Sequence, residues 1–105
     1  MNFTELGEKL GLDEDEFFEI VDLYLNTSAA DFAKLRDAID QNDAEKVTAV
    51  AHSLKGSSGN LGFMEAYDAA KEIEEWGRRG SLEGIQQSVQ LLNAKLSEIE
   101  KIARP

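Results

Sequence analysis

Hydrophobic positions recur every three or four residues along almost the whole chain, which is the spacing of an amphipathic helix. No segment alternates hydrophobic and polar residues over a useful length, so β-strands are not expected. The periodic segments predict helices over residues 3–10, 13–41, 43–61, 64–78 and 82–103. Only short polar or glycine-containing turns separate them. The pattern therefore predicts an all-α protein.

Several residues at the ends of these segments are suited to start or stop a helix. Asn2 is expected to cap the first helix, and Asp13 with Glu16 three residues later is typical of a capping box. Ser81 is the expected cap of the last helix. Gly62 is expected to end the helix before it by adopting a left-handed conformation.

Four of the predicted helices are long enough to form a bundle. Helices joined by short turns bury their hydrophobic stripes most simply in an antiparallel up-and-down arrangement. The short first helix would then cover one end of this four-helix bundle. A chain of 105 residues is long enough for one such core, so we expect a single domain over residues 1–105.

Composition and charge exclude several classes of function. The net charge of -10 would repel nucleic acid and anionic membrane surfaces, so neither is an expected partner. Without cysteine and with a single histidine, the chain has no disulfides, no thiol chemistry and no multi-histidine metal site. Neither a signal peptide nor a membrane span is visible. We expect a cytoplasmic monomer without a cofactor of its own.

The only histidine, His52, falls opposite the hydrophobic stripe of the predicted helix 43–61. At about 100° per residue, Val47, Val50, Leu54 and Leu61 lie roughly 160–220° around this helix from His52. A histidine without a special role is commonly found in a core or scattered on a surface. The stripe argues against a core position here, so His52 is expected to face solvent.

Two glycines share the side of the helix that carries His52. A glycine inside a helix costs about 0.8–1 kcal/mol relative to alanine, so Gly56 and Gly59 are expected to serve some purpose that bare backbone supplies. Because both flank the imidazole and face away from the stripe, we interpret them as room for a partner.

Lys55 lies three residues after His52 and within reach of its side chain. A neutral imidazole has one free ring nitrogen that can act as a nucleophile. Acid–base catalysis alone normally needs a second catalytic group nearby, and this helix face offers none. An exposed histidine, a neighbouring cation and a cleared approach favour a residue that accepts a phosphoryl group and passes it on.

The segment HSLKGSSGNLG, residues 52–62, resembles the signature of histidine phosphotransfer (HPt) domains of two-component phosphorelays. A histidine is followed by lysine and glycine three and four residues later, then by small residues, an apolar residue and a final glycine. The long preceding helix and the two following ones fit the same plan. The resemblance therefore covers nearly the whole chain and implies a phosphoryl carrier without ATP-dependent kinase activity.

The resemblance implies a role for each residue of the candidate site. His52 would be the phosphoacceptor, Lys55 would stabilise the phosphoryl group, and Gly56 would let a receiver domain approach. Glu74 matches a polar position that hydrogen-bonds the other ring nitrogen in many members. It could orient the ring, raise its basicity or simply pair with Arg78, which matches a basic position near the phosphoryl group in some members.

Other residues near these positions have simpler interpretations. Lys71 is best explained as part of a solvated ladder of charges on its helix, and the same interpretation stays open for Glu74 and Arg78. Arg79, beside Arg78 in a predicted turn, would add positive potential without a fixed partner. Phe18 and Leu25 would either join a docking surface or cover the short first helix.

The expected partners are receiver domains of hybrid sensor kinases and response regulators, and the resemblance implies that the receiver supplies Mg²⁺. His52 would accept a phosphoryl group from a receiver aspartyl phosphate and pass it reversibly to another receiver. Two alternatives remain open at this point. They are the phosphoacceptor domain of a chemotaxis-type kinase and a helical adaptor that binds receivers without carrying phosphate.

Overall fold

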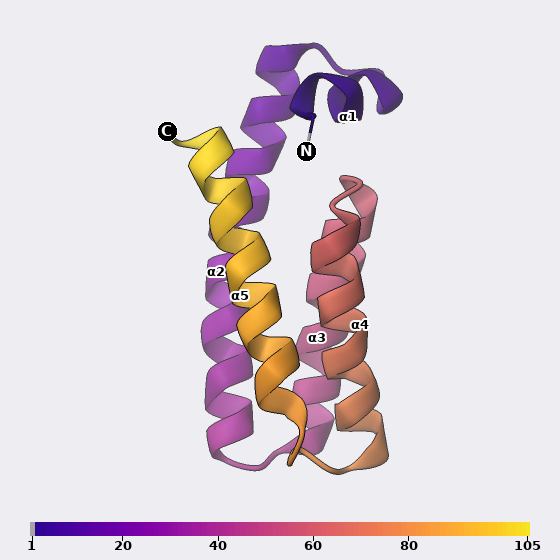
Figure 1. The fold of residues 1–105 in the computed structure, drawn as a ribbon, viewed down its shortest axis with the longest axis vertical. Helices are drawn as coiled ribbons and strands as arrows, with labels where there is room; N and C mark the ends of the chain where they lie inside the picture. The colour runs from indigo at the N-terminus through magenta and orange to yellow at the C-terminus, as the bar shows by residue number, and fades with distance from the viewer. Residues whose placement is uncertain (1) are drawn as a thin grey trace.

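A computed structural model describes residues 2–105, and this part of the chain is helical without strands. Its helices are α1 (Phe3–Lys9), α2 (Glu14–Asp40), α3 (Ala44–Asn60), α4 (Met64–Arg79) and α5 (Ile85–Ala103). Helices α2, α3, α4 and α5 each pack beside the next, and α5 returns to α2 (Figure 1). They form the predicted antiparallel four-helix bundle. No helix within residues 2–105 is long and apolar enough to cross a membrane.

Helix α1 lies across one end of the bundle, where α2 extends beyond the other helices (Figure 1). The Phe3 ring of α1 lies 5.6 Å from the Phe17 ring and 5.8 Å from the Phe63 ring, centroid to centroid. Phe63 also packs against Tyr24, with 5.2 Å between their centroids. This aromatic cluster closes the end of the core, as expected for a short covering helix.

Most of the predicted helix ends are confirmed. The Asn2 side chain accepts a hydrogen bond from the Glu5 amide at 3.1 Å. Asp13 and Glu16 form the reciprocal bonds of a capping box, at 2.8 and 3.1 Å. Gly62 follows α3 with a φ of +80°, a conformation that favours glycine. These caps satisfy backbone groups that a helix leaves without partners.

The prediction that Ser81 caps the last helix is wrong. Helix α5 begins at Ile85, three residues after the predicted start, and Gly84 precedes it without a side-chain cap. The Trp76 ring lies so close to Gly84 that an added Cβ would stand 2.5 Å from it. Gly84 therefore passes close to the indole, and Leu82 packs against the core before the helix starts.

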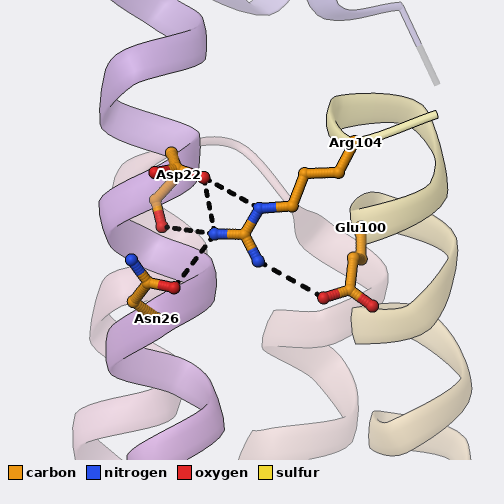
Figure 2. Close-up of polar contacts among 4 residues, drawn as sticks. All are labelled: Asp22, Asn26, Glu100 and Arg104. Carbon is orange, nitrogen blue, oxygen red and sulfur yellow. Dashed lines mark hydrogen bonds and ion pairs between the residues drawn. The ribbon is translucent and has the colours of Figure 1, made fainter.

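The last turn of α5 is tied to α2 by Arg104 (Figure 2). Its guanidinium donates to Asp22 Oδ1 from Nε at 2.8 Å and to Asn26 Oδ1 from Nη2 at 3.0 Å. Nη1 reaches Glu100 on α5 itself at 3.3 Å. The planar guanidinium has enough donors to bridge both helices at once. This contact fixes the N-terminal half of α2 against the end of α5.

Candidate functional site

Helix α3 presents His52 to solvent, as the hydrophobic pattern predicts. The imidazole side chain is 65 % exposed, whereas Val47 and Leu54 on the opposite side of α3 are fully buried. Asp43 begins the helix by accepting a hydrogen bond from the Lys46 amide at 3.1 Å. The stripe fixes the rotation of α3 against the core, and that rotation aims His52 outward.

The two glycines flanking His52 have different surroundings. Beyond its chain neighbours and its own helix backbone, a Cβ added at Gly56 would meet no atom within 4 Å, so this position is open surface. A Cβ added at Gly59 would lie 3.0 Å from the Tyr67 ring of α4. The interpretation of Gly59 as room for a partner is therefore wrong, because Tyr67 already occupies that space. Gly56 alone leaves the approach to His52 clear.

Glu74 of α4 brings the candidate residues together. Its carboxylate is nearly buried, with a side-chain exposure of 4 %. Oε2 accepts hydrogen bonds from His52 Nδ1 at 2.9 Å and from Arg78 Nη2 at 2.8 Å. Oε1 lies 2.7 Å from Lys55 Nζ. Glu74 therefore contacts both the imidazole and Arg78, so its sequence-based alternatives of ring contact and arginine pairing coexist.

The charge of Glu74 determines which nitrogen of His52 is free. Burial would raise the pKa of Glu74, but hydrogen bonds from Lys55, Arg78 and His52 and the lysine charge outweigh it and lower the pKa to about 2. At neutral pH the carboxylate is ionised and only accepts hydrogen bonds. The proton in that contact therefore belongs to His52 Nδ1. In the neutral ring, Nε2 then carries the lone pair and is the nucleophilic atom.

The same arrangement suits the transient addition of a dianionic group. Lys55 and Arg78 contribute two positive charges beside the ring, and Glu74 contributes one negative charge. An electrophile that bonds to Nε2 turns the ring into a cation, because Nδ1 keeps its proton. The Glu74 carboxylate is placed to balance that charge. Lys55 and Arg78 both have long side chains that can change rotamer without any shift of the helices.

The lowered pKa of Glu74 predicts that the carboxylate stabilises the fold in a defined pH range. Its pKa falls from 4.5 to about 2 on folding, so the contribution is present above about pH 5 and is lost as the pH falls toward 2. The carboxylate is covered by partners that are themselves partly exposed, so screening limits the contribution to about 2 kcal/mol. Chemical denaturation across this pH range would measure the effect.

The matched variant for this measurement is Glu74→Gln, which keeps the shape and removes the charge. Glu65 also has a lowered pKa because it pairs with Lys95, so acid unfolding of the wild type alone would mix two groups. We expect the wild type to exceed Glu74→Gln in unfolding free energy above about pH 5 and to lose that advantage in acid. A constant difference between pH 3 and pH 7 would contradict the assignment.

Two further basic residues lie near the site, and only one of them has a partner among the residues that the structure describes. Lys71 lines a shallow depression together with Lys55, Glu74 and Arg78, yet it is exposed, in keeping with a solvated charge. Arg79 stacks over the Trp76 ring at 5.0 Å from its centroid. The expectation that Arg79 has no fixed partner is therefore wrong, because the indole face attracts its guanidinium. Within residues 2–105, no cluster of acidic, histidine or cysteine side chains is arranged to hold a metal ion.

Of the two roles considered for Phe18 and Leu25, the structure favours packing over docking. Leu25 is only 6 % exposed. The Phe18 ring packs against Phe3 of α1, with 5.5 Å between their centroids. Phe18 therefore packs on α1 as the second role requires, whereas buried Leu25 lies beside Leu96 of α5.

The exposed apolar side chains of α2 are Ile20 and Leu23, at 38 % and 67 % exposure. Along a helix, Ile20, Leu23, Thr27 and Asp31 follow one another at steps of three and four and therefore share one face. Asp31 accepts a hydrogen bond from Ser53 of α3 at 3.2 Å, so this face borders α3 beside His52. Sequence reasoning missed both residues, although their positions off the α2 stripe could have identified them.

Comparisons with known proteins agree on one family. The model of the Hpt domain matches residues 19–102. Multistep phosphorelay regulator 1 of Schizosaccharomyces pombe is 32 % identical over 84 residues, which is 79 % of this chain and 28 % of that protein. Histidine-containing phosphotransfer protein B (HptB) of Pseudomonas aeruginosa PAO1 has a crystal structure that superposes with a TM-score of 0.87 at 25 % identity. That alignment covers 99 % of this chain and 90 % of HptB.

Proposed function

This chain belongs to the Hpt domain family, and from that premise we propose that His52 Nε2 accepts a phosphoryl group from a receiver aspartyl phosphate and returns it to a receiver. Similarity to a phosphorelay regulator and to a phosphotransfer protein supports a relay role. The chain spans about 28 % of the length of the relay regulator, so only the phosphotransfer step is proposed.

The phosphoryl transfer needs no reactant other than His52 and the receiver aspartyl phosphate. The Nε2 lone pair forms a P–N bond while the P–O bond to the receiver aspartate breaks, and the aspartate leaves as a carboxylate. Nδ1 keeps its proton and its hydrogen bond to Glu74. No proton has to move, so the reverse transfer follows the same path. Lys55 and Arg78 would stabilise the phosphoryl oxygens, and the receiver would supply Mg²⁺.

The observation that carries this proposal is the orientation of the imidazole. Glu74 accepts a hydrogen bond from His52 Nδ1 at 2.9 Å, while the imidazole is largely exposed. The open position at Gly56 lies one helical turn from His52. The free nitrogen is therefore the one that a partner can reach. This placement favours transfer to another macromolecule over chemistry inside a closed pocket.

We define the docking face as Gly56 and Ser53 of α3 with Ile20, Leu23 and Thr27 of α2. Its exposed apolar side chains suit burial against a protein partner. Lys55 and Arg78 add positive charge at the edge of the site, and a receiver's carboxylate-rich centre is complementary to them. A receiver domain is therefore the proposed occupant of this face.

A labelling experiment tests the proposal directly. The protein is mixed with each phosphorylated receiver of its source organism, and the initial rate of phosphoryl transfer is compared among receivers. We expect at least one receiver to transfer its label to this chain. The labelled protein should lose its phosphate in acid and retain it in alkali, as a phosphohistidine does.

Two controls test whether the protein has kinase activity of its own and whether it only binds receivers. With ATP and Mg²⁺ alone, no label is expected, because the chain is proposed to act without kinase activity. If every receiver binds but none labels the wild type, the protein is an adaptor and the carrier proposal is wrong. Label that survives acid would place the phosphate on a group other than histidine.

A further inference from the structure

Helices α3 and α4 approach each other closely at Gly77 and Thr48. Gly77 is buried within α4. A Cβ added there would lie 3.0 Å from the Thr48 backbone nitrogen and 3.1 Å from the Ala44 carbonyl oxygen, and closer still to Thr48 Oγ1. Contacts this short leave no room for any side chain at position 77. The two helices therefore meet here almost backbone to backbone.

The side chain of Thr48 cannot easily move out of the way. Its hydroxyl donates a hydrogen bond to the Ala44 carbonyl oxygen on the same helix, at 2.8 Å. Rotation about χ1 would break that bond and would meet the restricted rotamers of a β-branched residue. The contact surface that α3 offers to Gly77 is consequently rigid.

This close approach lies one helical turn from the candidate site on both helices. Thr48 precedes His52 by four residues on α3, and Gly77 follows Glu74 by three residues on α4. Because the helices are antiparallel, Thr48 faces Gly77 just as His52 faces Glu74. The spacing of the helices at one pair therefore determines the distance at the other.

We propose that Gly77 is a positioning residue, whose missing side chain holds α4 near enough to α3 for Glu74 to bind His52 Nδ1. The proposal rests on the proposed function of His52. A methyl group at position 77 would need about 1 Å more space to reach an ordinary carbon contact. The 2.9 Å bond between Glu74 and His52 would then lengthen beyond the range of a hydrogen bond.

The other two partners of Glu74 would respond differently to such a shift. Arg78 lies on the same helix as Glu74 and would move with it, and the long Lys55 side chain would follow the carboxylate. The imidazole has only a short stem and cannot follow. Loss of the Gly77 contact should therefore release His52 alone, which gives the inference a specific signature.

The variant Gly77→Ala tests this signature by ring ¹⁵N NMR. His52 is the only histidine, so the spectrum contains one imidazole. In alkaline buffer we expect the wild-type ring to carry its proton on Nδ1, and Gly77→Ala to shift population toward the Nε2-protonated tautomer. With Nε2 less available and the ring misplaced, the initial rate of phosphoryl transfer should fall about tenfold.

Gly84→Ala is the matched control, because its methyl group would press on Trp76 instead of α3. It should leave the His52 tautomer unchanged. Thr48→Ala combined with Gly77→Ala removes the shortest contact but keeps those to the Thr48 nitrogen and the Ala44 oxygen. This double variant should show a smaller tautomer shift than Gly77→Ala, and it carries the test if the single variant does not fold.

A wild-type tautomer population in Gly77→Ala or in the double variant would overturn the inference. So would an equal shift in Gly84→Ala, since any packing defect would then suffice. The NMR measurement needs no phosphoryl transfer. If the wild type accepts no label, the proposed function fails while the role of Gly77 in holding His52 is still decided by the spectrum.

Discussion

Replacement of His52 by glutamine is expected to abolish labelling by phosphorylated receivers while the protein stays folded. No other imidazole is present to accept the phosphoryl group. The glutamine amide can still donate a hydrogen bond to Glu74 but has no nucleophilic nitrogen. The imidazole is largely exposed, so the free energy of unfolding should change by about 1 kcal/mol or less. Labelling assays and circular dichroism together measure both parts of this result.

Ser53→Ala, which alters the docking face beside His52 but keeps the imidazole, is the control for His52→Gln. Ser53 is the next residue on α3, is exposed and donates only to the Asp31 carboxylate. Removing that surface hydrogen bond should leave labelling detectable. If His52→Gln keeps its acid-labile label, the phosphoacceptor lies elsewhere. If both variants lose the label, a disturbed surface between α2 and α3 would explain the loss as well as a missing nucleophile would.

The hydrophobic pattern predicted the fold and the outward position of His52 because both depend on local periodicity. A stripe such as Val47, Leu54 and Leu61 fixes which side of α3 is buried. The side of α3 that faces solvent can then be predicted without knowledge of the other helices. The open surroundings of Gly56 follow from the same argument.

The pattern could not predict how the helices are placed along one another. Glu74 looks like one charge in a solvated ladder until α4 is set against α3, and only then does its carboxylate meet Lys55 and His52. The interpretation of Gly59 as room for a partner fails for the same reason, because Tyr67 comes from α4. A helical wheel describes one helix, whereas the site belongs to the register of two.

Gly56→Leu is expected to stabilise the protein and yet to impair its function. Leucine favours a helix over glycine by about 0.5–1 kcal/mol, and the added side chain would point into open surface. The melting temperature should therefore rise by a few degrees. The same side chain would stand on the docking face beside His52. Forcing it into a receiver interface should cost about 1–3 kcal/mol, or roughly 5- to 150-fold in the transfer rate.

Gly56→Ala separates steric exclusion from helix flexibility as the reason for glycine at this position. Alanine gives a gain in helix stability at least as large as that of leucine. It adds only one methyl group, which would meet no atom within 4 Å beyond its chain neighbours and its own helix backbone. If glycine serves access, transfer should fall little in Gly56→Ala and strongly in Gly56→Leu. If glycine serves a flexible helix, both variants should slow transfer equally, because both stiffen α3. Initial transfer rates measured over a range of receiver concentrations distinguish these outcomes, and wild-type rates in Gly56→Leu would refute the steric account.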